Sequence, residues 1–308
     1  MSDMLTHWAT YDDCCRLAQL DETIAPDFRR LLVSNASEAR FGTLTRGGGV
    51  WMEPTLRNAM ARWNDPAQTE RNERNVAFVL GGLIHQSCDR VMKPLLTKAG
   101  GDDWSKVIYQ MQGSPQEQAA NAEQIAKTQE GSAYFDAEVF RQVYLGGSVE
   151  PFNSLFLAEA SPAGESFEAV IKAMFQRTIL TSHTLKPEMD NMEAWLDNLF
   201  DRVQALPLKI ERWVQVFKHG DPAKAKALGV DEGFYNPKDP LIQAARLLQG
   251  GNPLEPALKR QVYEEGASTC AYGDVLQTGL VYLRSASAFW RGEVKAFSAP
   301  NYIKQHAS

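Results

Sequence analysis

Cysteine is scarce in this sequence, and the cysteines present are not spaced for a metal site or a disulfide framework. The four cysteines form no CxxC motif and stand at Cys14, Cys15, Cys88 and Cys270. Adjacent cysteines such as the first two rarely bond to each other. We therefore expect reduced, mostly buried thiols, as in a cytoplasmic protein.

Long apolar runs are also missing. No stretch reaches the run of about 18 apolar residues that a membrane-spanning helix needs. Residues 1–8 contain neither the basic segment nor the apolar run of a secretory signal. The sequence therefore predicts no transmembrane segment, no leader and a cytoplasmic location.

Positive charge is not in excess either. The formal net charge is -6 and the isoelectric point is about 5.5. Extended nucleic acids and anionic membrane surfaces are bound by basic proteins, so neither is an expected partner. A small anionic substrate held at a metal ion is compatible with this charge.

What the sequence does contain is helical periodicity over most of its length. Hydrophobic residues make up 44% of the 308 positions, which is enough for a substantial core, and alternating β-branched segments are almost absent. We therefore expect a single all-α domain over residues 1–308. The expected helices span residues 8–20, 27–34, 50–63, 70–96, 115–130, 132–145, 165–182, 189–205, 207–218, 254–265 and 270–292.

Two features interrupt this pattern. Pro94 is expected to end or kink the helix at 70–96, with a loop at 97–103. Residues 219–253 are rich in glycine and proline, so they are expected to be irregular. They also hold many apolar residues, which favours an excursion within one domain over a solvated linker.

His85 and Asp89 are the most informative candidates for chemistry. They stand four residues apart in an otherwise apolar helix, so both side chains project from one helical face. A helix that presents imidazole and carboxylate in this way can supply two metal ligands. The other interpretation is a His–Asp pair that only braces the core. Gly81 and Gly82, one turn earlier, suggest the close approach of another backbone or of a ligand.

Two segments together resemble the zinc-dependent phospholipase C / S1–P1 nuclease superfamily. The opening at residues 5–9 (LTHWA) resembles the start of many members, and residues 78–94 resemble the family's helix with a His-xxx-Asp pair followed by proline. Members are all-α and bind up to three zinc ions. The resemblance implies that His7, His85 and Asp89 are metal ligands.

The rest of the family's ligand set is incomplete in this chain. Leu95 stands where the family has a histidine after the proline. Tyr134 replaces the histidine of the family's His-xxx-Glu pair, whose glutamate matches Glu138. His183 is a candidate replacement ligand, at the junction of two amphipathic segments. The helices at 165–205 are expected to help enclose the site.

The expected function is a metal-dependent hydrolase that cleaves a small phosphoester with a metal-activated water. The candidate metal ligands are His7, His85, Asp89, His183 and Glu138, which would hold one or two divalent ions. Zinc suits histidine and carboxylate ligands, as do iron and manganese. Two alternatives stay open: a non-haem iron oxidase on a helical scaffold, and a non-catalytic relative that keeps the His85–Asp89 pair for packing. The sequence assigns no general base and no oligomeric state.

Overall fold

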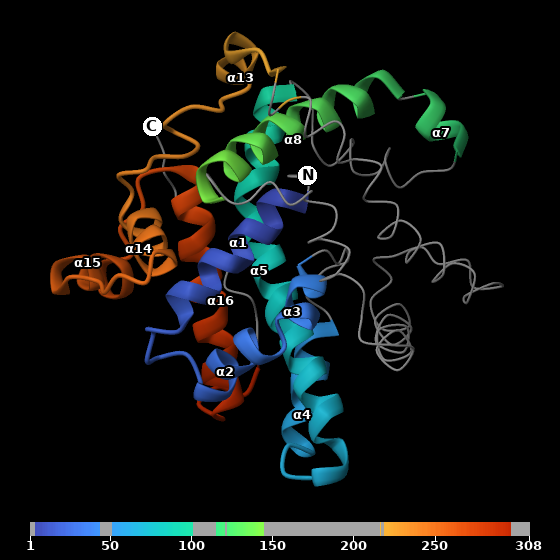
Figure 1. Cartoon of the computed structure of the whole chain (residues 1–308). Helices are drawn as coiled ribbons and strands as arrows, with labels where there is room; N and C mark the ends of the chain where they lie inside the picture. Colours follow the sequence, from blue (N-terminus) through green and yellow to red (C-terminus); the bar gives the residue numbers. More distant parts are fainter. Residues whose placement is uncertain are drawn as a thin grey trace. The chain divides into compact units, whose positions relative to one another are not determined.

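The computed structural model describes residues 4–43, 51–100, 115–120, 122–144, 216 and 219–296 (Figure 1). Across these residues the chain forms helices joined by turns and has no β-strand, which confirms the all-α prediction. None of the described helices is long and apolar enough to cross a membrane. All four cysteines are free thiols.

Figure 1 labels most of the helices along the chain. In order they are α1 (Met4–Ala18), α2 (Pro26–Ser34), α3 (Ala36–Gly42), α4 (Met52–Ala61), the 3-10 turn η2 (Pro66–Gln68), α5 (Thr69–Gly100), α7 (Pro115–Ala120), α8 (Ala122–Val143), α13 (Pro222–Ala227), α14 (Pro240–Gln249), α15 (Pro256–Arg260), the π-helical turn η4 (Gln261–Glu265) and α16 (Ala271–Trp290).

Helices α5 and α8 are longer than the sequence pattern indicates. Helix α5 continues through Pro94 to Gly100, so residues 97–100 of the expected loop are helical, and residues 101–103 lie outside the described residues. A proline inside a helix costs one backbone hydrogen bond and crowds the carbonyl four residues earlier, but here the helix continues on both sides of Pro94. Helix α8 likewise continues through Gly131, where two helices were expected. The helices expected at 165–182, 189–205 and 207–218 lie outside the described residues, except for Val216.

The excursion expected to be irregular at 219–253 contains two helices. Pro222 and Pro240 occupy the first turn of α13 and α14, where a missing N–H costs no hydrogen bond. Asp221 and Asp239 precede them as N-caps, and each side chain accepts hydrogen bonds from the first turn of its helix. These prolines begin helices, and the proline count alone does not distinguish that role from chain breaking.

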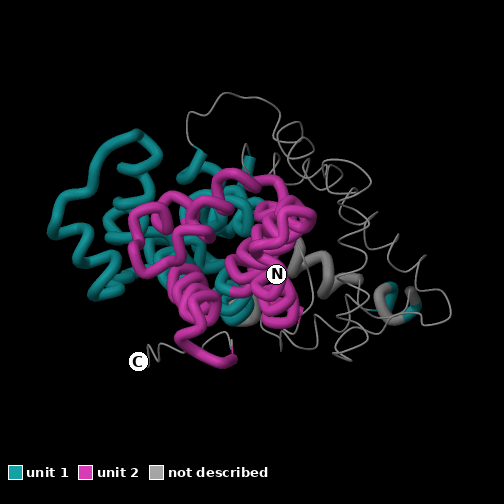
Figure 2. Tube along the Cα trace, turned by 90° about the horizontal axis from the view of Figure 1, so that it is seen from below, with its two compact units in different colours: residues 1–13, 87–153, 206–277 teal, residues 14–86, 154–205, 278–308 magenta. Residues whose placement is uncertain are grey.

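The described chain divides into two compact units, each assembled from three segments (Figure 2). Unit 1 comprises Met1–Asp13, Ser87–Asn153 and Leu206–Gln277, and unit 2 comprises Cys14–Gln86, Ser154–Ala205 and Thr278–Ser308. The boundaries after Asp13, Gln86 and Gln277 fall inside α1, α5 and α16 respectively. Both units are therefore built from segments far apart in sequence, and the single-domain assignment stays a prediction.

In unit 2, glycines let the backbones of α3 and α5 touch. A Cβ on Gly81 would lie 1.8 Å from the carbonyl oxygen of Ala39 and 3.0 Å from the Cα of Gly42. A Cβ on Gly42 would lie 2.2 Å from the carbonyl oxygen of Phe78. No side chain fits between two backbones at this separation. The expectation that the glycine pair marks a close approach is confirmed, and at Gly81 the neighbour is another backbone.

Helix α16 also packs on the N-terminal segments of unit 2. Trp290 contacts Phe28 and Trp63, with ring centroids 5.3 and 4.7 Å apart respectively. The guanidinium of Arg284 pairs with the buried carboxylate of Asp21 at 2.7 Å. Aromatic packing and a buried ion pair therefore attach the C-terminal helix to the N-terminal segments of this unit.

In unit 1, buried carboxylates join α14 to its neighbours. Asp239 is fully buried; its Oδ1 accepts from the N–H groups of Leu241 and Ile242, and its Oδ2 accepts from the N–H of Thr269 at 2.6 Å. One carboxylate thus caps α14 and also binds the loop before α16. This dual role explains why a buried charge is tolerated at this position.

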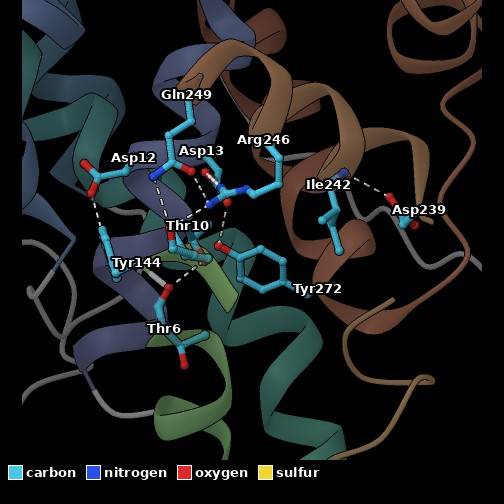
Figure 3. A network of polar contacts seen from close by, with 11 residues as sticks. Thr6, Thr10, Asp12, Asp13, Tyr144, Asp239, Ile242, Arg246, Gln249 and Tyr272 are labelled. Carbon is cyan, nitrogen blue, oxygen red and sulfur yellow. Dashed lines mark hydrogen bonds and ion pairs between the residues drawn. The ribbon is translucent and has the colours of Figure 1, made fainter. Parts of the chain in front are cut away.

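A second buried carboxylate, Asp13 of α1, receives Arg246 of α14 (Figure 3). The same guanidinium donates to the carbonyl oxygen of Val143 at 2.8 Å. The hydroxyl of Tyr272 donates to the other oxygen of Asp13 at 3.1 Å. Burial, with the nearby charge of Asp13, raises the pKa of Tyr272 well above its ordinary value, so this hydroxyl remains a donor.

The glycine contact predicts opposite effects for two Gly→Ala substitutions in helix interiors. Gly81→Ala should lower the free energy of unfolding by about 1–3 kcal/mol, because its Cβ would overlap the Ala39 carbonyl. Gly131→Ala should raise it by about 0.5–1 kcal/mol, since alanine favours the helix. The nearest neighbour to that Cβ is Leu228 Cδ2 at 3.8 Å. Urea unfolding of both variants tests this, and equal effects would contradict the backbone contact.

The two Asp-Pro caps form a second matched pair. Asp221→Ala should cost about 0.5–1 kcal/mol, because this exposed cap accepts only from Ala223. Asp239→Ala should cost about 3 kcal/mol, since it also leaves the N–H of Thr269 without its acceptor. Thermal and urea unfolding measure both values. A loss for Asp239→Ala no larger than for Asp221→Ala would show that the bond to the loop contributes nothing.

Candidate metal centre

The first half of α1 is buried on every side, and it carries polar residues. Residues 5–14 are all buried, and His7 is only 4% exposed. Buried polar side chains need partners because removing them from water is costly. The identity of these partners therefore shows what α1 does in unit 1.

Asp136 of α8 anchors the start of α1. Its fully buried carboxylate accepts hydrogen bonds from the N–H groups of Leu5 at 3.0 Å and Thr6 at 3.2 Å, and from the hydroxyl of Thr6. A helix leaves its first N–H groups without intrahelical partners, and a negative charge at that end is favoured by the helix dipole. Asp136 therefore caps α1 from a distant segment and fixes the backbone immediately before His7.

His85 is held in unit 2 by the segment that follows α3. Its Nδ1 lies 2.8 Å from the carbonyl oxygen of Thr43. The carbonyl can only accept, so Nδ1 carries the proton and Nε2 is the nitrogen with a lone pair. Thr43 immediately follows Gly42, which contacts α5 through its backbone. The glycine contact therefore brings a backbone carbonyl to the imidazole and selects its tautomer.

Asp89 follows His85 by four residues on α5 and is also buried. Its Oδ1 lies 3.7 Å from Nε2 of His7, within unit 1. That distance exceeds the length of a hydrogen bond between nitrogen and oxygen. Its Oδ2 lies 2.6 Å from Nζ of Lys93, one further turn along the helix. Asp89 therefore faces an imidazole with one oxygen and an ammonium with the other.

These three side chains form the group that could hold a metal ion. One ligand atom from each of His7, His85 and Asp89 lies within 4.8 Å of the others. The spacing of His85 and Asp89 is set by α5 itself, because the helix is continuous between them. The pairing of His7 with Asp89 depends on the contact between α1 and α5 in unit 1. His7 and Asp89, which are 82 positions apart in sequence (89 − 7), are thus brought together within unit 1.

The donor set suits a divalent ion of intermediate softness. Two imidazoles and one carboxylate match zinc, and also iron or manganese. Ligand atoms of a tetrahedral zinc site lie about 3.3 Å apart for bonds of about 2.0–2.1 Å, so the 3.7 Å pair is close to that spacing. The Nδ1–H of His85 on a backbone carbonyl is the outer contact that a metal-binding histidine commonly makes.

The other predicted ligands are placed differently. Glu138 of α8 is not a member of this group, and its carboxylate accepts from Arg141 and Gln142 of the same helix, both at 2.8 Å. Tyr134 accepts a hydrogen bond from the N–H of Asp221. His183, with the 165–205 helices expected to enclose the site, lies outside the described residues. The role of Glu138 and His183 as ligands stays a prediction.

Three residues that shape this centre were not identified from the sequence. Asp136, Thr43 and Lys93 each act on a candidate ligand or on the backbone beside it. Lys93 had a local signal, since it stands four residues after Asp89 on the same helix. Asp136 and Thr43 had none, because their contacts join segments 131 and 42 residues apart.

Two neighbouring acids of α8 test how the centre is positioned. Asp136→Ala should weaken zinc binding about tenfold by releasing the backbone before His7, with a loss of about 1–2 kcal/mol in stability. Glu138→Ala should leave zinc affinity unchanged if its carboxylate serves only α8. Zinc titration against a chromophoric chelator measures both. Unchanged affinity in Asp136→Ala would remove its positioning role, and weakened affinity in Glu138→Ala would make Glu138 a ligand.

Comparison with known proteins assigns no family to this geometry. Neither a family model, nor a curated protein, nor a solved structure gives a significant match to the chain. The case for a metal centre therefore stands on the chain's own residues: two buried imidazoles and a buried carboxylate with neighbouring ligand atoms.

Proposed function

We propose that this chain is a metal-dependent hydrolase of small phosphoesters, with His7, His85 and Asp89 as metal ligands. The observation that carries the proposal is the placement of one ligand atom from each residue within 4.8 Å of the others, in buried surroundings. These are the ligands implied by the resemblance to the zinc-dependent phospholipase C / S1–P1 nuclease superfamily. An all-helical fold is also what that resemblance implies.

The residues around the centre define what the protein itself contributes. The carbonyl oxygen of Thr43 accepts from Nδ1 of His85, so in the neutral imidazole the lone pair is on Nε2. Asp136 fixes the backbone before His7. When bound, a divalent ion would lower the pKa of a coordinated water and stabilise negative charge on the phosphoryl oxygens. Zinc is the leading candidate, with iron and manganese as alternatives.

The substrate class follows from charge and chemistry together. A metal centre attracts phosphate oxygens locally, whereas the formal net charge of -6 gives the chain no general attraction for a polyanion. We therefore propose a small phosphoester substrate, such as a phosphodiester headgroup, over an extended nucleic acid.

The two alternatives make different use of the same residues. A non-haem iron oxidase draws several carboxylates from its helices, commonly as a Glu-xxx-His motif, and the sequence has no such motif. A non-catalytic protein would keep the group for stability, and the ion pair of Lys93 with Asp89 favours this second reading. In that case Asp89→Ala would change stability alone.

Elemental analysis and a chromogenic assay together test the proposal. Protein purified without a chelator or a metal-affinity tag should contain nearly stoichiometric zinc and hydrolyse bis(p-nitrophenyl) phosphate. EDTA should abolish the activity and added zinc should restore it. His85→Ala should lose both metal and activity, because it removes a ligand.

The exposed His219 provides the matched control, and His219→Ala should retain metal and activity. Iron in place of zinc, with oxygen-dependent turnover, would favour the oxidase. A wild-type protein that binds no metal even after incubation with zinc would overturn the proposal and leave a binding or structural role.

A further inference from the structure

Asp89 is shared between two neighbours of different charge. Its Oδ1 faces Nε2 of His7 at 3.7 Å, and its Oδ2 receives the ammonium of Lys93 at 2.6 Å. The second contact has the short length typical of a charge-assisted hydrogen bond. One oxygen therefore faces the metal-binding group, while the other is already engaged by a cation of the chain itself.

Lys93 lies on the same face of α5 as the candidate ligands His85 and Asp89. His85, Asp89 and Lys93 follow one another at intervals of four residues on α5, so they project from one side of the helix. The Asp89 side chain is 12% exposed, and a carboxylate this buried needs compensating charge. The ammonium of Lys93, itself 31% exposed, supplies that charge from within the chain.

An ammonium and a divalent ion compete for one carboxylate. Both are attracted to its negative charge, and they repel each other at these distances. An ion bound between His7 and Asp89 would find half of the carboxylate occupied and a positive charge beside it. This constraint is a property of Asp89 and Lys93, and it applies to any divalent cation.

We propose that Lys93 regulates the centre by competing with the metal ion for Asp89. Its ammonium neutralises Asp89 in the metal-free protein, restricts the ion to Oδ1 and lowers the affinity of the site. The fraction of protein molecules with a bound ion then depends on the concentration of available metal. This inference rests on the proposed function, because it requires that the group binds a divalent ion.

Zinc titration of charge-removing variants tests the competition. Lys93→Met keeps the aliphatic stem but removes the ammonium, so its zinc Kd should be about tenfold lower than that of the wild type, equivalent to 1.4 kcal/mol. Lys93→Gln removes the charge but keeps an N–H donor for Asp89, and it should also bind zinc more tightly. It covers the case in which Lys93→Met fails to fold. Lys93→Arg keeps the charge and should stay close to the wild-type affinity.

A second lysine–carboxylate pair supplies the control. Lys224 of α13 pairs with Glu130 of α8 away from the metal-binding group, so Lys224→Met should leave the zinc Kd unchanged. Thermal unfolding with and without zinc gives an independent reading, since tighter binding must enlarge the zinc-dependent rise in Tm.

The possible outcomes separate this inference from the proposed function. Zinc binding by the wild type that does not tighten in Lys93→Met or Lys93→Gln overturns the competition and leaves the metal centre standing. Binding only in the lysine variants supports the competition and overturns a zinc-dependent function for the native chain. Absence of binding in every protein overturns both.

Discussion

The contact between the backbones of α3 and α5 is the constraint on which the candidate centre depends. Gly42 and Gly81 allow the two helices to meet with no side chain between them. The residue after this contact, Thr43, therefore presents its carbonyl oxygen to Nδ1 of His85. A Cβ at either glycine would push α3 away from α5 and take this acceptor with it. The tautomer of the histidine is thus coupled to the packing of α3 on α5 one turn away.

In unit 1, buried carboxylates hold helices in place. The partners of each carboxylate indicate whether its role is structural. Asp136 and Asp239 are satisfied by backbone N–H groups and fix helix ends. Asp13 is satisfied by Arg246 and Tyr272. These three acids have partners with the geometry of hydrogen bonds, which is what a structural role requires. Asp89 has a partner of this kind at one oxygen, since its Oδ2 lies 2.6 Å from Nζ of Lys93, while its Oδ1 faces Nε2 of His7 at 3.7 Å.

The proposed function uses the group of His7, His85 and Asp89 to bind a cation, and the alternative keeps the group for packing alone. A pair kept only for packing gains most from a direct hydrogen bond between its members. Two imidazoles and a carboxylate with neighbouring ligand atoms instead have the arrangement that a cation can bridge. The ammonium of Lys93 already compensates the negative charge of Asp89. In the proposed competition, the same ion pair sets the affinity of the group for a metal ion.

Local periodicity was enough to predict the helical class and the positions of most helices among the described residues. It also determined the His85–Asp89 pair, since a spacing of four residues places both on one helical face. It was wrong about the ends of α5 and α8 and about the helices within 219–253, where Pro94, Gly131 and Pro240 have roles that depend on context. The family resemblance implied that His7 and Asp89 belong to one site, but the capping of α1 by Asp136 and the contact of Thr43 with His85 are visible in the folded structure alone. Each of these contacts joins segments far apart in the chain, and local spacing carries no information about which distant segment will meet a given side chain.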